Sequence, residues 1–334
     1  MTTPLLTPWP TLAHLPWRAI EDGLINATFA VGSPPVAVVQ ALAPIFTAAV
    51  NDDIDAVTRH IQSRGLETPL LLRTGDGATC ATQDGRCWRA LTWIPGETVH
   101  RLTSPEQARE AGALVGRWHR ATADLDHAFA FARAGVHDTP AHMRDLESAV
   151  AAHPDHRLAA EAAPLAAAIL AAWRSLPSSP PAPLQVCHGD LKVSNVRFRE
   201  GRAVALVDLD TMGMQSLDAE LGDAWRSWCN PRGEDTTDAT LDLVLLEAAA
   251  KGYLAERPLP PDVREAVATG PERIALELAA RFCRDALEER YFGFSPRVAP
   301  TRGDHNLLRA RGQLALATAM RTHRDAIRRI LAGA

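Results

Sequence analysis

Two acidic residues and an asparagine occur in one short region, with a spacing that suits phosphoryl transfer. Residues 188–195 read His-Gly-Asp-Leu-Lys-Val-Ser-Asn, so Asp190 precedes Asn195 on one loop, and Asp208 ends the next β-prone run. In phosphoryl transfer, an aspartate orients the acceptor hydroxyl and takes its proton, while an asparagine and a second aspartate hold Mg²⁺ against the phosphates of ATP. The spacing therefore predicts Asp190 as catalytic, Asn195 and Asp208 as Mg²⁺ ligands, and ATP as the donor substrate.

Lys192 lies two residues after the predicted catalytic aspartate, in a chain whose only other lysine is Lys251. An ammonium group beside the transferring phosphoryl group offsets the charge that develops on its oxygens. We therefore predict a catalytic role for Lys192.

The elements that must position these residues fall into two blocks. The first block is β-prone with one helix: strands are predicted at 28–31, 36–40, 69–73, 78–82 and 87–94, and an amphipathic helix over 48–64. Asp84-Gly85, between two of these runs, is a typical hairpin turn. Pro95-Gly96 ends the block.

The second block is mainly helical. Ser104-Pro-Glu-Gln107 combines a helix N-cap, a proline at the first helical position and a capping-box glutamine. A helix is predicted over 155–176, a loop over 177–183, and helices from about 216 onward. Three short strands, at 184–187, 195–199 and 203–207, are expected to frame the catalytic loop.

The catalytic-loop pattern resembles that of the aminoglycoside phosphotransferase/choline kinase superfamily, whose catalytic loop is His-x-Asp-x4-Asn. Weaker stretches, such as Gly23 to Phe29, Val207 to Thr211 and His305 to Gln313, resemble its N-acetylhexosamine 1-kinase-like branch. The resemblance implies an α+β, bilobal protein-kinase-like fold. It places an N-lobe at 1–94, a hinge at 95–97 and a C-lobe at 98–334.

The resemblance also implies site residues and a substrate class. The adenine would lie near Leu91, Trp93 and Ile94, and the acceptor would be a sugar or amino sugar. In this resemblance the acceptor contacts residues from both parts of the chain, namely Asn26, Asp210, Arg309 and Arg311. Two further residues, His188 and Asp223, hold the catalytic loop in position without contacting the substrate. Asp210 is equally well interpreted as a cap at the hairpin end, and only one of the two arginines is expected to point inward.

Two positions depart from the family pattern. Kinases of this fold hold the ATP phosphates with a lysine on the third strand of the N-lobe, paired with a glutamate. This chain has Gln40 in that strand, which we predict to bind the nucleotide, although it can donate only a hydrogen bond and carries no charge. We expect Asp52 and Asp53, near the glutamate's place, to be solvated helix charges. In the first turn, where sugar-kinase relatives carry a histidine, this chain has Leu24.

Two other functions remain open. An antibiotic kinase acting on a cationic acceptor would need an acidic groove, which Asp285, Glu288 and Glu289 could supply. A nucleotide-binding pseudokinase with a regulatory role would explain the missing lysine, but the set of Asp190, Lys192, Asn195 and Asp208 argues against it. His119 and the tryptophans are expected in the core.

Composition limits the partners. The net charge of −5 gives no support for nucleic-acid binding, and no run of apolar residues is long enough to span a membrane. The first ten residues lack the basic start and apolar stretch of a secretion signal. The five cysteines are scattered, as in a protein with reduced thiols. We therefore expect a cytoplasmic protein acting on small molecules, and make no prediction of its oligomeric state.

Overall fold

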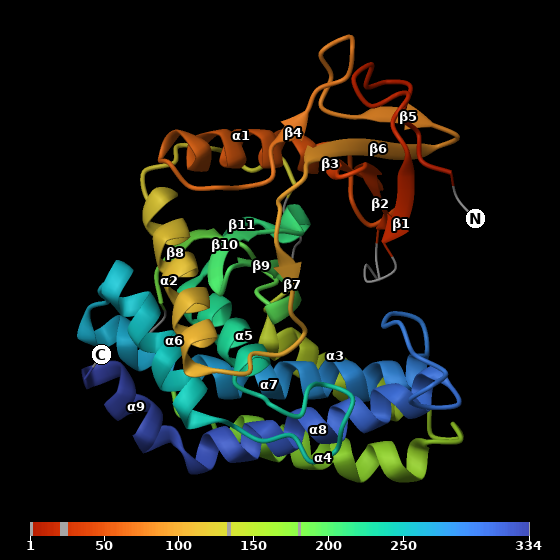
Figure 1. The fold of residues 1–334 in the computed structure, drawn as a ribbon. Coiled ribbons are helices and arrows are strands. Elements are labelled where there is room, and N and C mark those ends of the chain that lie inside the picture. Colours follow the sequence, from red (N-terminus) through yellow and green to blue (C-terminus); the bar gives the residue numbers. More distant parts are fainter. Residues whose placement is uncertain (1–2, 21–25, 132–134, 180–181, 334) are drawn as a thin grey trace.

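The protein combines a β-sheet N-terminal region with a largely helical C-terminal part, which confirms the predicted α+β class (Figure 1). The computed structural model describes residues 3–20, 26–131, 135–179 and 182–333. In Figure 1 the N-terminal sheet and α1 lie at the top, the short strands β7–β11 lie in the middle, and most of the helices lie below. The helices of the described residues include none long and apolar enough to cross a membrane.

The N-terminal sheet has six antiparallel strands in the order β1-β2-β3-β6-β4, with β5 also paired to β6. Its strands are β1 (Trp17–Ile20), β2 (Ala27–Gly32), β3 (Pro35–Ala41), β4 (Leu71–Leu72), β5 (Ala81–Gln83) and β6 (Arg86–Thr92). Asp84 and Gly85 both have positive φ, which is the conformation that a tight β5–β6 hairpin requires. The predicted turn is therefore confirmed, whereas β1 was not predicted.

One face of this sheet is closed by the chain's own N-terminal segment. Leu6, Trp9 and Leu12 pack with Phe29 and Trp88 in a small hydrophobic core. The indole of Trp9 also donates a hydrogen bond of 2.7 Å to the carbonyl of Leu72. Helix α1 (Val50–Ser63) instead belongs to the larger core of the molecule, into which it buries Ile54, Val57 and Ile61 as its three- and four-residue spacing predicts.

Two small sheets lie between the N-terminal sheet and the helices. Strands β7 (Glu97–Thr98), β9 (Val196–Arg199) and β10 (Arg202–Leu206) form one, and β8 (Leu184–Cys187) pairs with β11 (Gly213–Ser216) in the other. Gly96, just before β7, has φ +133°, and a Cβ there would lie 2.3 Å from the carbonyl oxygen of Phe198. Only glycine lets the chain pass so close to β9 as it leaves the N-terminal sheet.

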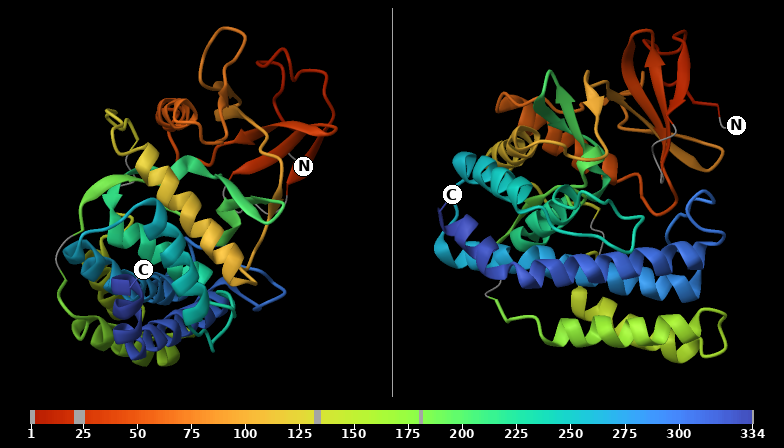
Figure 2. Two further views of the ribbon diagram at one scale, coloured as in Figure 1. Left: turned by 60° about the vertical axis from the view of Figure 1, so that its left-hand side comes forward. Right: turned by 60° about the horizontal axis from the view of Figure 1, so that its bottom comes forward.

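The helical part is built around α7, which packs against α3, α4, α5, α8 and α9. The right-hand view of Figure 2 shows α4, α7 and α8 lying lengthwise beside one another. The helices after α1 are α2 (Pro105–Ala121), α3 (Thr139–Ala152), α4 (Ala159–Arg174), α5 (Leu217–Trp228), α6 (Leu243–Glu256), α7 (Pro261–Glu288), α8 (Arg302–Thr322) and α9 (Arg324–Gly333). Ser104 caps α2 by accepting a hydrogen bond from the backbone N–H of Gln107, as predicted. Helix α3 was not predicted.

Candidate active site

The predicted catalytic loop follows β8 and makes its turn at a glycine. Gly189 has φ +79°, and a Cβ at this position would lie 2.4 Å from the carbonyl oxygen of Thr211. The glycine of the His-Gly-Asp sequence is therefore needed both for the backbone conformation and for the close approach of the segment after Asp208.

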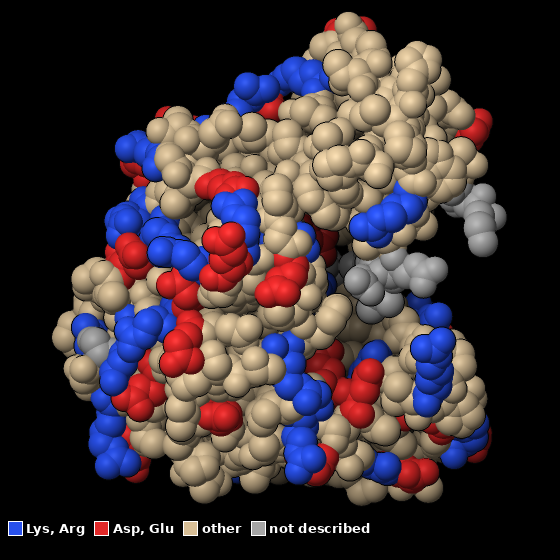
Figure 3. Space-filling model, in the orientation of Figure 1, with Lys and Arg blue, Asp and Glu red and all other residues tan. Residues whose placement is uncertain are grey.

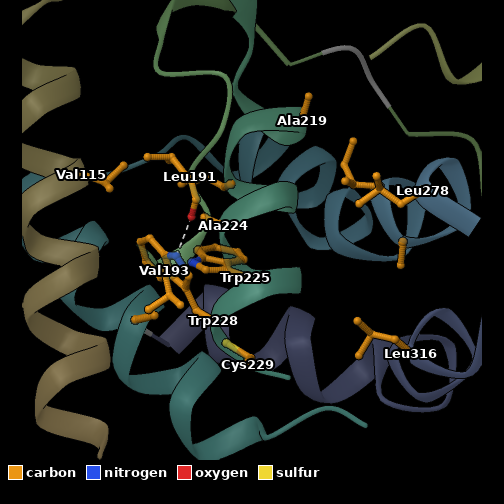
Figure 4. Close-up of a cluster of buried hydrophobic side chains, with 14 of the residues drawn as sticks. Val115, Leu191, Val193, Ala219, Ala224, Trp225, Trp228, Cys229, Leu278 and Leu316 are labelled. Carbon is orange, nitrogen blue, oxygen red and sulfur yellow. Dashed lines mark hydrogen bonds between the residues drawn. The ribbon is translucent and has the colours of Figure 1, made fainter. Parts of the chain in front are cut away.

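Apolar residues of the loop anchor it in the helical core. Leu191 and Val193 are buried, while Asp190 and Lys192, which alternate with them, have side chains 31% and 42% exposed. Trp228 of α5 donates a hydrogen bond of 2.6 Å from its indole nitrogen to the carbonyl of Leu191 (Figure 4). The alternation of apolar and polar residues thus fixes which side chains can face a substrate.

The backbone of the loop rests on a buried carboxylate, Glu220 of α5. Its two oxygens accept hydrogen bonds from the backbone N–H groups of His188 (2.8 Å) and Gly189 (3.0 Å). His119 of α2 contacts the same carboxylate at 3.2 Å, and Tyr253 of α6 contacts His119 at 3.0 Å. Three helices therefore converge on the start of the catalytic loop.

His119, Glu220 and Cys187 lie close enough together to be considered as metal ligands, but their chemistry does not favour a metal. Burial raises the pKa of the Cys187 thiol well above its usual range, and burial lowers the pKa of His119. Both effects favour neutral groups, and the oxygens of Glu220 are already engaged with the loop. We interpret the cluster as structural, which agrees with the expectation that His119 is a core residue.

Replacing Glu220 by alanine should destabilise the protein. The change leaves two buried backbone N–H groups without an acceptor, and each such group costs about 1–3 kcal/mol. We expect the free energy of unfolding in denaturant to fall by at least about 2 kcal/mol. Glu247→Ala, which removes an exposed partner of Lys251 on α6, should change it by less than about 0.5 kcal/mol. Equal stability of the two variants would contradict this account.

His188 links the catalytic loop to Val207, the residue before Asp208. Its Nε2 lies 2.9 Å from the carbonyl oxygen of Val207, and its Nδ1 lies 3.3 Å from the backbone nitrogen of Asp190. Because a carbonyl can only accept and a backbone N–H can only donate, the proton must be on Nε2. His188 therefore joins the two segments, and its support of catalysis stays a prediction.

The four residues predicted to carry the chemistry come together. The Nζ atom of Lys192 lies 2.7 Å from Oδ2 of Asp190 and 3.7 Å from Oδ2 of Asp208. Asn195 donates from Nδ2 to the backbone carbonyl of Asp190 at 2.8 Å and to its carboxylate at 3.2 Å. The backbone N–H of Val207 bonds to the carbonyl of Asn195, which brings the second segment alongside the first.

The charges in this group oppose one another. Burial raises the pKa of Asp190, but the nearby Lys192 and the hydrogen bond from Asn195 outweigh it, so its pKa lies below the usual range. For Asp208, burial and the neighbouring Asp210 and Asp190 raise the pKa against the effect of Lys192, and the result lies above the usual range. Asp190 is thus held ionised. The surroundings of Asp208 disfavour its charged form, and a bound cation would favour that form again.

The residues present fit a Mg²⁺ ion. The amide nitrogen of Asn195 is turned toward Asp190, which leaves its amide oxygen available as a ligand. Asp208 supplies a partly exposed carboxylate, and these are the hard oxygen donors that Mg²⁺ takes alongside phosphates and water. A bound Mg²⁺ would neutralise charge on the phosphates of the donor.

Gln40, Asn26 and Asp210 meet in one buried network, together with Arg89, which the sequence analysis did not consider. Gln40 accepts two hydrogen bonds from Arg89, and Asp210 pairs with Arg89 and accepts from Nδ2 of Asn26 at 2.6 Å. Asn26 and Asp210 are 7% and 2% exposed. Since these side chains face protein partners, the arrangement does not support the prediction that Asn26 and Asp210 contact the acceptor.

Asp53 was predicted to be a solvated helix charge, and this is wrong. It is 2% exposed and accepts hydrogen bonds from His127 Nε2 and from the backbone N–H groups of Ala130 and Phe131. It therefore fixes the segment that follows α2. Asp52 is exposed, as expected, and contacts Thr79.

The two arginines of α8 point in different directions, as their spacing implies. Arg309 donates to Asp235 and to the carbonyl of Gly293, both at 2.8 Å, and its side chain is 13% exposed. Arg311 pairs with Glu161 of α4 at 2.5 Å and is 42% exposed.

A series of charged contacts connects Arg309 with the catalytic loop. Asp235 follows Glu234, which pairs with Arg226 of α5, and Arg226 pairs with Asp223. The charge of Asp223 in turn raises the pKa of Lys192, although burial and the nearer Asp190 and Asp208 act on it more strongly. Asp223, predicted to support the catalytic loop, thus holds Arg226, while the loop is held by Glu220 and Trp228 of the same helix.

The carboxylates proposed for an acidic acceptor groove are engaged within the protein. Asp285 is buried and accepts hydrogen bonds from the backbone N–H groups of residues 290–292 and from Asn306. Glu288 pairs with Arg284 and Arg290, and Glu289 pairs with Arg157. The three carboxylates that an acidic acceptor groove would need are therefore bonded to other residues of the protein.

The predicted adenine-binding residues lie at the end of β6 and just beyond it. Leu91 and Ile94 are buried, and the ring of Trp93 stacks with the guanidinium of Arg197 at 5.5 Å. Arg197 also donates to the carbonyl of Ile94 at 3.2 Å.

Leu24, where the family carries a histidine, lies outside the described residues. Figure 3 shows the surface hollowed between the strand-rich part and the helical part, and on this face basic and acidic side chains are interspersed.

Comparison with known proteins identifies the family. The pattern of the phosphotransferase enzyme family APH matches residues 16–259, and the chain belongs to this family. A homoserine kinase of Xanthobacter autotrophicus is 28% identical over 272 residues, which cover 79% of this chain and 76% of that protein. The chain is a kinase, a phosphotransferase whose acceptor is a hydroxyl group.

Solved structures confirm the kinase-like fold. A microcompartment-associated aminopropanol kinase superposes with a TM-score of 0.64 at 16% identity, over 96% of both chains. An aminoglycoside phosphotransferase of Alicyclobacillus acidocaldarius gives 0.60 at 17% identity, over 98% of both chains. The predicted superfamily is confirmed by these findings, whereas its N-acetylhexosamine kinase branch stays a prediction.

Proposed function

We propose that this kinase transfers the γ-phosphoryl group of Mg²⁺-bound ATP to a hydroxyl of a small polar acceptor. The observation that carries the proposal is the gathering of Asp190, Lys192, Asn195 and Asp208 around one point. In this proposal Asp190 takes the hydroxyl proton, Lys192 offsets charge on the transferring group, and Asn195 and Asp208 hold the metal ion. The adenine lies against Leu91, Trp93 and Ile94, and the boundary between the lobes lies at 95–97.

For the acceptor, we propose a sugar or amino sugar. The support is the stretch from His305 to Gln313, which resembles sugar kinases and forms the start of α8 beside the loop that Arg309 contacts. A short amino alcohol is the second candidate, because the relatives include proteins named homoserine kinase and aminopropanol kinase. Both classes offer a hydroxyl to Asp190 and an amine or further hydroxyls for recognition.

A panel of acceptors tests both the kinase reaction and the proposed class of acceptor. ADP release should be measured with Mg²⁺ and ATP in the presence of amino sugars, neutral sugars, short amino alcohols including homoserine, and aminoglycosides. Turnover that requires Mg²⁺ and is highest for one of the first three classes is the expected result. Turnover with aminoglycosides alone would overturn the acceptor assignment. Binding of ATP with no turnover on any acceptor would favour a pseudokinase.

Arg309 and Arg311 provide a matched pair for locating the acceptor. Arg309 lies in the stretch that resembles sugar kinases, and its contacts hold Asp235 and the carbonyl of Gly293 in place. Arg309→Ala should therefore raise the KM for the acceptor by about tenfold or more, and leave the KM for ATP within about twofold. Arg311→Ala, on the same helix but paired with Glu161, should leave both values within about twofold. Steady-state kinetics that show the reverse ranking would place the acceptor elsewhere.

A further inference from the structure

A buried arginine of the N-terminal sheet points at the segment that carries Asp208. Arg89 lies on β6 directly opposite Gln40 of β3, and its side chain is 1% exposed. Its guanidinium forms an ion pair through Nη1 with Oδ1 of Asp210, two residues beyond Asp208. The guanidinium of Arg89 therefore places a positive charge between the sheet and the predicted metal site.

Gln40 holds this guanidinium in a fixed orientation. Its Oε1 accepts hydrogen bonds from Nε and Nη2 of Arg89, at 2.9 and 2.7 Å. Its Nε2 donates to Oγ1 of Thr28 at 3.2 Å, so Thr28, Gln40 and Arg89 form a row across β2, β3 and β6. With one edge of the guanidinium fixed by Gln40, the Nη1 end is directed at the 208–210 segment.

Fold stability alone does not explain this pair. Removing two charges from water costs about as much as their attraction returns, and apolar residues of similar volume often stabilise a core equally well. The chain also has no lysine before Lys192, and Lys192 is bonded to Asp190. Arg89 is therefore a cation of the N-terminal sheet whose direction suits an anion arriving beside Asp208.

We propose that Arg89 binds the α- or β-phosphate of the nucleotide, and that Asp210 occupies the guanidinium when no nucleotide is bound. On binding, a phosphate oxygen replaces Oδ1 of Asp210 as the acceptor for Nη1, while Gln40 keeps its two hydrogen bonds and Asn26 keeps Asp210. Carboxylate and phosphate oxygens suit the planar guanidinium fork equally well, which makes the exchange geometrically simple. The inference rests on the proposed use of ATP.

Binding measurements with and without phosphate groups test this role. Arg89→Ala should weaken the binding of Mg²⁺-ADP, measured by titration calorimetry, by about tenfold or more, since a charged hydrogen bond is lost. Adenosine, measured by displacement of ADP, should bind within about twofold of its affinity for the wild type. Arg89→Lys, which keeps the charge, should recover part of the ADP affinity. Equal losses for ADP and adenosine, or no loss for ADP, would show that Arg89 only joins the sheet to the 208–210 segment.

A second comparison covers the case in which Arg89→Ala does not fold, because it leaves Asp210 buried without its partner. The double variant Arg89→Met with Asp210→Asn removes both charges and is compared with Asp210→Asn alone. The double variant should bind ADP about tenfold more weakly than the single variant, and equal affinities would overturn the proposal. If the wild type binds no ADP, the proposed use of ATP fails, and the role of Arg89 fails with it. A wild type that binds ADP as tightly as the Arg89 variants refutes only the role of Arg89.

Discussion

Asp190→Asn should lower kcat by about 10²- to 10⁴-fold, because an amide cannot take the proton of the acceptor hydroxyl. Asn195 and Asp208 are the predicted metal ligands, so the affinity for Mg²⁺-ATP should stay within a few-fold of the wild type. The fold should also persist, because the loop is held by Glu220, Trp228 and Gly189 through contacts that do not involve the carboxylate of Asp190.

Single-turnover and steady-state rates on the best acceptor of the panel measure this effect, with nucleotide binding measured separately. Asp155→Asn, an exposed aspartate of the helical part, is the matched control and should keep full activity. If Asp190→Asn retained more than about a tenth of the wild-type kcat, Asp190 would not be the group that accepts the proton.

Lys192→Ala should lower kcat by about 10²-fold, with a smaller change in the KM for ATP, because the ammonium acts on charge that develops during transfer. It should also shift the pH profile. Lys192 is the main group that lowers the pKa of Asp190 against the effect of burial, so its removal raises the pKa of that carboxyl. A base works only when deprotonated, and the acid limb of kcat/KM should therefore move to higher pH.

The chain offers a matched control in Lys251, its only other lysine, which pairs with Glu247 on α6. Lys251→Ala should leave both kcat and the acid limb in place. Lys192→Arg keeps a positive charge and should leave the acid limb closer to that of the wild type than Lys192→Ala does. A Lys192→Ala enzyme with wild-type kcat, or with an acid limb at lower pH, would contradict the assigned role.

The sequence predicted those elements whose local signals agree with their place in the fold. The α1 periodicity, the Asp84-Gly85 turn and the Ser104 cap all depend on neighbouring residues, and all three are confirmed. Strands β1, β7 and β11 are only two to four residues long, so short windows carry little of their signal. Strands β7 and β11 also depend on partners far away in the sequence, β9 and β8. Helix α3 was missed although Asp138 and Pro140 give it a capped start.

In the site, the sequence pointed to the residues proposed to act on substrate more readily than to those that hold them in place. Asp190, Lys192, Asn195 and Asp208 fall within one motif and its neighbour, and the structure brings them together. Glu220 and Arg89 act through contacts that only the tertiary fold creates. The sequence does contain one indication of Arg89's role. It is a charged residue within the mainly apolar run from Cys87 to Ile94, and a charged residue in a central strand needs a buried partner.

The convergence of three helices on the catalytic loop has a consequence during protein synthesis. The loop rests on Glu220, Glu220 contacts His119 across 101 residues of chain, and His119 contacts Tyr253 across 134. A ribosome completes the whole catalytic motif well before it reaches α6. Because contacts so distant in sequence form only after both partners have left the ribosome, a nascent chain that ends before α6 carries every predicted catalytic residue but lacks part of their frame. The missing parts are Tyr253 and helix α7, which packs against α5. Prematurely terminated products that end between α5 and α6 would therefore contain the complete motif and still be unable to phosphorylate any acceptor.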